Sequence, residues 1–214
     1  MKAFFKVAKI FVDEKGNEAY ISDGYGNRRV AVLDRKTGEI KRYWGAYGNK
    51  PNDEDLGRYN PTAPPAQQFR TPVHCAELSN DGKVYVCDRV NNRIQSFTKE
   101  GKFLKEVFIE RESLADGSTW DLVFSKDQKY LIVADGRNQM IHIVDREAME
   151  VVTSFGDGGR QPGQWYGLHS IATDSKGNLY TTETYEGKRV QKFVYKGMGT
   201  VARYQGTPRP SGTR

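Results

Sequence analysis

The chain contains no hydrophobic run of the length that a membrane-spanning helix requires, and its mean hydropathy is low, at −0.73. Its first residues are basic, but Lys6 and Lys9 interrupt any apolar segment of signal-peptide length, and no small-residue cleavage site follows. These absences argue against a membrane protein and against a cleaved leader in this chain. We therefore expect a soluble protein, and its sequence assigns it no compartment.

Cysteine is also scarce, with two residues among 214. Cys75 and Cys87 flank an Asn-Asp-Gly turn almost symmetrically, so they are expected to face each other on neighbouring strands. Directly opposed strand positions seldom accommodate a disulfide without strain, so the pattern favours two buried free thiols over a disulfide.

An excess of charge is lacking too, because 33 basic residues stand against 27 acidic residues and leave a net charge of +6. Residues 187–214 hold seven Lys or Arg and no acid, but no aromatic residues interleave with arginines there. The sequence therefore does not favour a nucleic-acid partner. The last residues, 206–214, are short, polar and contain proline, which predicts a flexible tail.

What the chain does contain is a repeat, best seen in residues 71–97. Each copy has an apolar strand, a turn, a second strand closed by an acid, another turn and a third strand, and a fourth strand follows. The pattern occurs four times. The strand-closing acids are Asp23, Asp88, Asp135 and Glu183, at intervals of 65, 47 and 48 residues. Four short antiparallel strands at such a period predict an all-β fold, a β-propeller of four four-stranded blades.

The repeat sets the domain boundaries. We expect one propeller domain over residues 1–205, with blades at about 6–45, 70–110, 118–156 and 166–205. Residues 46–68 break the periodic pattern with four prolines and mixed charge, so they predict an inserted loop that either covers a site or is a mobile surface excursion. The first blade begins near the start of the chain, and no further domain is expected before it.

One position of the repeat collects polar residues on the propeller axis. Fourteen residues before each strand-closing acid stand Lys9, His74, Asp121 and His169. Inner strands line the central channel of a propeller, so these four residues are expected to form a ring. Lys9 and Asp121 are predicted to line the channel and to be able to pair with each other.

The two ring histidines suggest a metal, since neutral imidazole binds zinc while a second partner orients the ring. Hairpin symmetry places Asp88 opposite His74 and Glu183 opposite His169, so each acid could hold the second nitrogen of its histidine or could cap a turn. The alternative is a pair of channel-lining histidines solvated by water. The third histidine, His142, falls on an outer strand and is expected to pack or to be exposed.

The segments DGYGNRRV, CDRVNNRI and GLHSIATDSKGNLY resemble NHL-type repeats, whose propellers usually have six blades. Four blades then form either a small closed ring or an arc of a larger propeller. Self-association could complete such an arc, because it would cover exposed sheet faces and edges.

The order SDGYGNRR, PVHCAEL, VCDRVNNRI and GLHSIATD is similar to peptidyl-α-hydroxyglycine α-amidating lyases. This resemblance implies zinc bound by His74 and His169, Tyr25 as a base and Arg89 as a clamp for the substrate carboxylate. It also allows calcium and an extracytoplasmic location. The family's third zinc histidine belongs to a blade that precedes the first one here, and Ser170 replaces an acid of the family.

Two functions are therefore open. The first is a metal-dependent lyase-like propeller that cleaves a C–N bond of a peptide or small molecule in the central channel, to give a peptide amide and glyoxylate. The second is a non-catalytic propeller that binds a peptide, protein or glycan.

Overall fold

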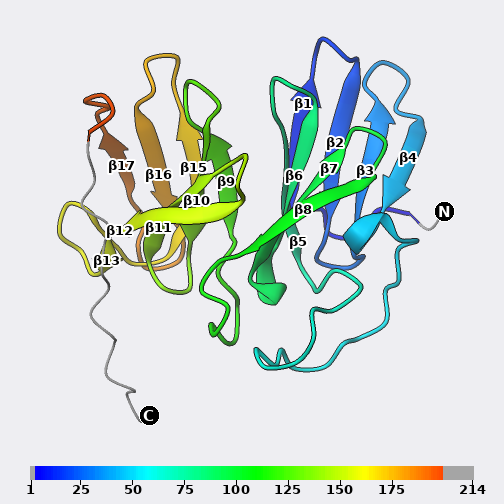
Figure 1. Ribbon diagram of the computed structural model, residues 1–214, viewed down its shortest axis with the longest axis horizontal. Coiled ribbons are helices and arrows are strands. Elements are labelled where there is room, and N and C mark those ends of the chain that lie inside the picture. Colours follow the sequence, from blue (N-terminus) through cyan, green and yellow to red (C-terminus); the bar gives the residue numbers. More distant parts are fainter. Residues whose placement is uncertain (1–2, 200–214) are drawn as a thin grey trace.

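The computed structural model describes residues 3–199, and it is a four-blade β-propeller whose sheets surround a common axis (Figure 1). The prediction of an all-β propeller is confirmed. Within each blade β-branched and aromatic residues form the strands, while residues that tolerate a positive φ form the turns. Gly82, for example, has a φ of 79° in the turn between the first two strands of blade two.

The innermost strand of each blade comes first in sequence, and each blade's strands pair in an antiparallel order. The first three sheets have four strands each, and the fourth has three within the described residues. Blade one contains β1 (Lys9–Asp13), β2 (Glu18–Asp23), β3 (Arg29–Asp34) and β4 (Ile40–Trp44); blade two contains β5 (Val73–Leu78), β6 (Lys83–Asp88), β7 (Arg93–Thr98) and β8 (Phe103–Phe108). Blade three contains β9 (Asp121–Phe124), β10 (Tyr130–Asp135), β11 (Met140–Asp145) and β12 (Glu150–Phe155); blade four contains β15 (Leu168–Thr173), β16 (Leu179–Glu183) and β17 (Val190–Phe193).

The remaining elements are short. Two 3-10 turns, η1 (Ala46–Gly48) and η2 (Arg89–Asn91), follow β4 and β6, and a small parallel pair, β13 (Asp157–Gly158) and β14 (Gln164–Trp165), joins blades three and four. The predicted last strand of blade four and the predicted tail lie outside the described residues.

Neighbouring blades are held together by apolar cores that they share. One core joins blades one and two around Trp44 and Phe97, a second joins blades two and three around Tyr85 and Leu131, and a third joins blades three and four around Trp165. Burying one such side chain stabilises the fold by roughly 1.5–3 kcal/mol. No blade could bury its sheet face alone, so each blade depends on its neighbours for stability.

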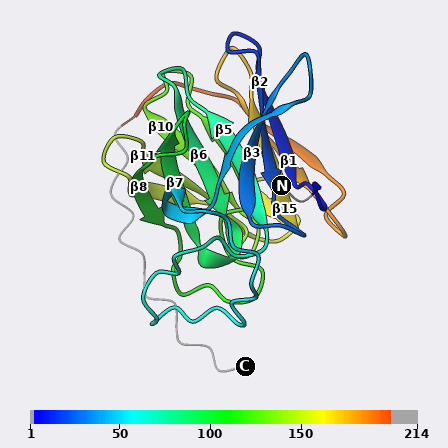
Figure 2. The same cartoon turned by 90° about the vertical axis from the view of Figure 1, so that its right-hand side faces the viewer.

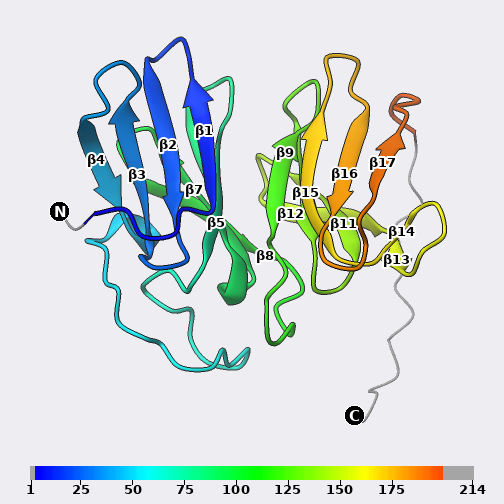
Figure 3. The ribbon, with the colours of Figure 1, turned by 180° about the vertical axis from the view of Figure 1, so that it is seen from behind.

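The contacts between inner strands run from β1 to β5, from β5 to β9 and from β9 to β15. Blade one lies on the left and blade four on the right in Figure 3. Ile10 and Val12 on β1 and Tyr43 on β4 are exposed, so one apolar face of blade one is uncovered in the described part of the chain. Completion of this face by a second copy stays a prediction.

The inserted loop 46–68 lies at one end of the propeller, beneath blade two in Figure 2. It is tied to the blades at several points. Asp53 accepts a hydrogen bond from the backbone of Arg28 at 3.0 Å, and the Tyr59 hydroxyl donates to the carbonyl of Arg111 at 2.9 Å. The loop is therefore anchored to both blades one and two.

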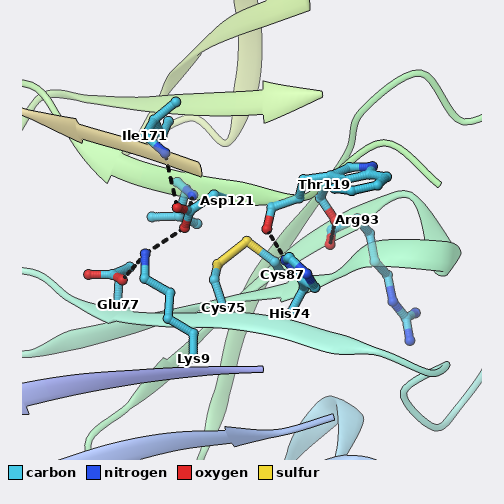
Figure 4. The surroundings of a disulfide bond; sticks show 11 residues. Lys9, His74, Cys75, Glu77, Cys87, Arg93, Thr119, Asp121 and Ile171 are labelled. Atoms are coloured by element: carbon cyan, nitrogen blue, oxygen red, sulfur yellow. Dashed lines mark hydrogen bonds and ion pairs between the residues drawn. A yellow bond between two sulfur atoms is a disulfide. The ribbon is translucent and has the colours of Figure 1, made fainter. Parts of the chain in front are cut away.

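The prediction of two free thiols is wrong, because Cys75 and Cys87 form a disulfide (Figure 4). They are directly paired residues of β5 and β6, with Cα atoms 4.9 Å apart, which lies within the disulfide range. A β-bulge adjoins Cys75, and bulges increase the local twist of a strand pair. The prediction of free thiols assumed a regular ladder, which lacks this distortion.

Candidate functional site

The structure brings the ring positions together where the inner strands begin. The rings of His74 and His169 lie 5.1 Å apart between centroids, and the Lys9 ammonium lies 2.6 Å from Asp121. Tyr25 and Arg89 reach the same place from the turns that follow β2 and β6.

Both histidines occupy irregular points of their strands. The pairing of β5 with β6 shifts between Val73 and Cys75, and that of β15 with β16 shifts between Leu168 and Ser170. Lys9 and Asp121, at the equivalent positions of blades one and three, belong to a regular ladder. Since a bulge redirects the side chain that it contains, the bulges explain how two histidines from alternate blades turn toward each other.

His74 has a defined tautomer. Its Nδ1 bonds the backbone carbonyl of Trp120, which can only accept, so Nδ1 carries the proton and Nε2 presents a lone pair. Nε2 accepts a hydrogen bond from the Tyr25 hydroxyl at 3.0 Å. Burial lowers the pKa of His74 to about 3, and the positive charge of Arg89 adds to this effect. His74 is therefore neutral, and its unprotonated nitrogen faces Tyr25.

His169 is half-buried, and burial lowers its pKa as well. Its Nδ1 lies 2.9 Å from the Ser170 hydroxyl. The hydroxyl of Ser170 thus orients this ring. Its Nε2 has no hydrogen-bond partner among the described residues and stays available to a ligand.

Arg89 is a buried cation without a carboxylate partner in the described chain. Its guanidinium stacks 4.4 Å from the centre of the Trp120 ring, and its Nη1 donates to the Tyr25 hydroxyl at 3.4 Å. Its Nε is buried and has no hydrogen-bond partner. A buried charge with an unsatisfied donor indicates a place for an anion, since guanidinium binds carboxylate in a bidentate pair.

The glycines beside Tyr25 allow close approach between segments. A Cβ on Gly24 would lie 2.0 Å from the carbonyl oxygen of Val73 at the start of β5, and one on Gly26 would lie 1.9 Å from the Phe5 ring. The turn that carries Tyr25 therefore packs directly on blade two and sets the phenol beside His74.

Asp88 and Glu183 do not hold the second nitrogens of the histidines. Asp88 accepts hydrogen bonds from Arg93 at 2.8 Å and from Asn91 at 2.7 Å, and Glu183 accepts from Arg189 at 2.6 Å. The bulges move the acids out of the expected register, to positions opposite Val73 and Leu168. The alternative prediction, that these acids cap turns, is met only in part: Asn91 lies in the turn after β6, but Arg93 begins β7 and Arg189 directly precedes β17.

A contact of this kind between the strand-closing acid and a cation or imidazole, here called the clasp, recurs in all four blades. In each, the strand-closing acid binds a cation or imidazole on the next strand or directly before it, in the pairs Asp23–Arg29, Asp88–Arg93, Asp135–His142 and Glu183–Arg189. His142 is thus a buried member of the blade-three clasp, 3.0 Å from Asp135.

Two residues that contribute to the site, Trp120 and Glu77, were not predicted from the sequence. Trp120 holds His74 through its carbonyl and supports Arg89 through its ring, and its place beside the ring residue Asp121 was the available signal. Glu77 lies 2.7 Å from Lys9, which it shares with Asp121 (Figure 4). Lys9 and Glu77 line a channel cavity of about 660 Å³. Burial raises the pKa of Glu77 to about 7.

A catalytic zinc site generally needs three protein ligands. His74 and His169 supply two nitrogens, and residues 3–199 contain no cluster of three or more His, Cys, Asp or Glu that could hold a metal. The residues present fit a zinc ion in part, so zinc stays a proposal. Calcium stays a proposal as well, and the two channel carboxylates that could bind it are engaged by Lys9.

Comparison with curated proteins found relatives of two kinds, while no family model matches. Human NHL repeat-containing protein 3 is 31% identical over 202 residues, which cover 89% of this chain and 50% of that protein. Peptidyl-glycine alpha-amidating monooxygenase B from Xenopus laevis is 30% identical over 107 residues, which cover 50% of this chain and 11% of that protein. The chain spans half or less of these curated relatives.

Similar solved structures share the fold. They include Kuenenia stuttgartiensis hydrazine synthase, with a TM-score of 0.61 at 16% identity over 90% of this chain and 47% of that one, and a streptogramin B lyase, with 0.56 at 15% over 89% and 55%. The β-propeller domain of Myceliophteria thermophila Cps50 (Swd1) has a TM-score of 0.54 at 12% identity over 89% and 54%. This chain is a β-propeller. Its blades are NHL-type repeats, and it belongs with the NHL-repeat propellers.

Within residues 3–199, no helix has the length and apolar character that a bilayer crossing needs.

Proposed function

We propose that the site at the end of the channel binds a molecule ending in α-hydroxyglycine and cleaves its C–N bond, as an amidating lyase would. The observation that carries this proposal is Arg89, a buried guanidinium with an unsatisfied Nε, next to a neutral histidine and a tyrosine hydroxyl. Similarity to part of an alpha-amidating monooxygenase supports it.

In this proposal Arg89 binds the carboxylate of the substrate in a bidentate pair, and Trp120 keeps the guanidinium plane fixed. The α-hydroxyl then lies beside Tyr25. Holding the reacting groups in this geometry lowers the entropic part of the barrier.

The chemistry needs two proton transfers and no oxidant. Tyr25 takes the proton of the substrate hydroxyl and in the same step gives its own proton to the leaving nitrogen, while neutral His74 orients the phenol through Nε2. The substrate oxygen forms a C=O bond with the α-carbon, the C–N bond breaks, and its electron pair stays on the nitrogen, which keeps the proton from Tyr25. The products are a peptide amide and glyoxylate.

Zinc held by Nε2 of His74 and by His169 would supply Lewis acidity toward the substrate oxygens, and it would take the place of the Tyr25 hydrogen bond to Nε2. No step above depends on it. The partial ligand set favours one alternative, a propeller that binds the same carboxylate-ended ligand without cleaving it.

Binding can be tested by titration calorimetry with an N-acyl-α-hydroxyglycine peptide and with its C-terminal amide. We expect the acid to bind and the amide to bind at least tenfold more weakly, because only the acid can pair with Arg89. The Arg89→Gln variant should lose this preference, and Arg35→Gln, an exposed arginine in a distant turn, should keep it. Equal binding of acid and amide would reject the proposed role of Arg89.

A further inference from the structure

A second cluster of arginines surrounds a cavity under the inserted loop, outside the site described above. This cavity has a volume of about 170 Å³, and its walls come from loop residues 56–66, from the segments flanking β5 and β8, and from blade two itself. Its four charged residues are all arginines: Arg58, Arg70, Arg93 and Arg111.

The positive charge is only partly compensated. Arg93 is paired with Asp88 at 2.8 Å, and Glu106 lies 3.4 Å from its other end. Arg70 and Arg111 form no ion pair with any described residue, and neither does Arg58, which is exposed. No acidic side chain lines the cavity.

The guanidinium groups are held in place by uncharged partners. Arg70 donates through Nε to Asn91 at 3.0 Å, and Arg111 donates through Nη2 to the carbonyl of Ala63 at 3.1 Å. Tyr59 lies under Arg70, and Phe108 lies 4.7 Å under Arg111. Stacking of this kind fixes the plane of a guanidinium. The Nη1 of Arg70 also donates to the carbonyl of Gly57, so its Nη2 is the group left to donate into the cavity.

Arg111 has an unsatisfied donor. Its Nε is buried and has no hydrogen-bond partner. Burial also lowers the pKa of Arg70, so the folded chain holds this cation at a cost. Buried donors are normally satisfied, and an anion in the cavity would satisfy this one.

We propose that this cavity is a binding site for a small oxyanion group, a phosphate or a carboxylate, held by Arg58, Arg70 and Arg111. Its volume is that of several waters, which suits one such group and is below that of a pocket for a drug-sized ligand. The site is separate from Arg89 and does not rest on the proposed lyase activity. The inserted loop forms one wall, which gives this loop a function.

Titration calorimetry at low ionic strength with inorganic phosphate, and separately with acetate, tests the proposal. We expect one phosphate per chain. Loss of one charge-assisted hydrogen bond costs about tenfold in affinity, so Arg58→Gln/Arg111→Gln should weaken binding by tenfold or more. Stronger binding of phosphate than acetate would identify a tetrahedral anion as the ligand, and the reverse order a carboxylate.

Three controls separate this site from others. Arg35→Gln removes the same charge from an exposed turn and should leave affinity unchanged, and Arg89→Gln should leave it unchanged as well. Arg58→Gln alone changes an exposed side chain, so the fold should survive even if the double variant unfolds, and affinity should fall severalfold. Absence of binding at millimolar phosphate, or equal affinity in wild type and both Arg58 variants, would overturn the proposal.

Discussion

Replacing Glu77 by Gln should change how the stability of this propeller depends on pH. Lys9, on blade one, lies 2.7 Å from Glu77 on blade two and 2.6 Å from Asp121 on blade three. One cation thus faces two buried carboxylates. Burial raises the pKa of Glu77 from 4.5 to about 7, and the neighbouring charge of Asp121 acts in the same direction.

The sign follows from proton binding. Between pH 4.5 and 7 the folded chain keeps a proton on Glu77 that the unfolded chain has lost, so stability falls as pH rises through this window. With these two values, the free energy of unfolding drops by about 2.5 kcal/mol between pH 5 and pH 8. Glutamine cannot ionise, so Glu77→Gln should remove this drop while leaving the Lys9–Asp121 pair in place.

Urea unfolding at pH 5 and pH 8, followed by tryptophan fluorescence, measures the effect. Groups remote from Glu77 titrate equally in both proteins, so the difference between the two pH dependences reports Glu77 together with its coupled neighbours Lys9 and Asp121. Glu14→Gln is the matched control, since Glu14 is exposed in a turn. If wild type and Glu77→Gln show the same pH dependence, the three-blade charge cluster does not exist as described.

Three further predictions concern the clasp, the disulfide and the metal. Asp88→Asn takes from the buried Arg93 its carboxylate at 2.8 Å and leaves Glu106 at 3.4 Å, so thermal or urea unfolding should report a loss of about 3 kcal/mol. Asp157→Asn, on an exposed residue, should change stability by less than about 0.5 kcal/mol. A loss below 1 kcal/mol for Asp88→Asn would contradict a structural role for the clasp. Reduction of Cys75–Cys87 should lower the free energy of unfolding by about 2–3 kcal/mol, and two free thiols in denatured, unreduced protein would show that the bond is not formed. Elemental analysis should find about one zinc per chain, lost in His74→Ala/His169→Ala, and a metal-free wild type would remove zinc from the proposal.

The repeat made the fold predictable, because turn residues and strand-closing acids recur at a regular spacing. It also placed His74, His169, Lys9 and Asp121 near one axis. Counting along the chain could not reveal the bulges at the two histidines, which depend on packing between blades.

For the same reason the partners of Asp88 and Glu183 were only one of two predicted alternatives, and the disulfide was not anticipated. Trp120 was missed because a backbone carbonyl carries no residue signature. The arginine cavity depends on the course of a loop with no periodic pattern, so its residues are 53 positions apart in sequence, from Arg58 to Arg111.

The most direct test of the central claim is glyoxylate release from an N-acyl-α-hydroxyglycine peptide, with and without added zinc. We expect wild type to release glyoxylate above the spontaneous rate. We expect the rate to fall at least a hundredfold in Tyr25→Phe and in Arg89→Gln, since each removes a group that acts on the substrate. Release at the spontaneous rate under both conditions, with the peptide bound, would contradict catalysis and leave a carboxylate-binding propeller.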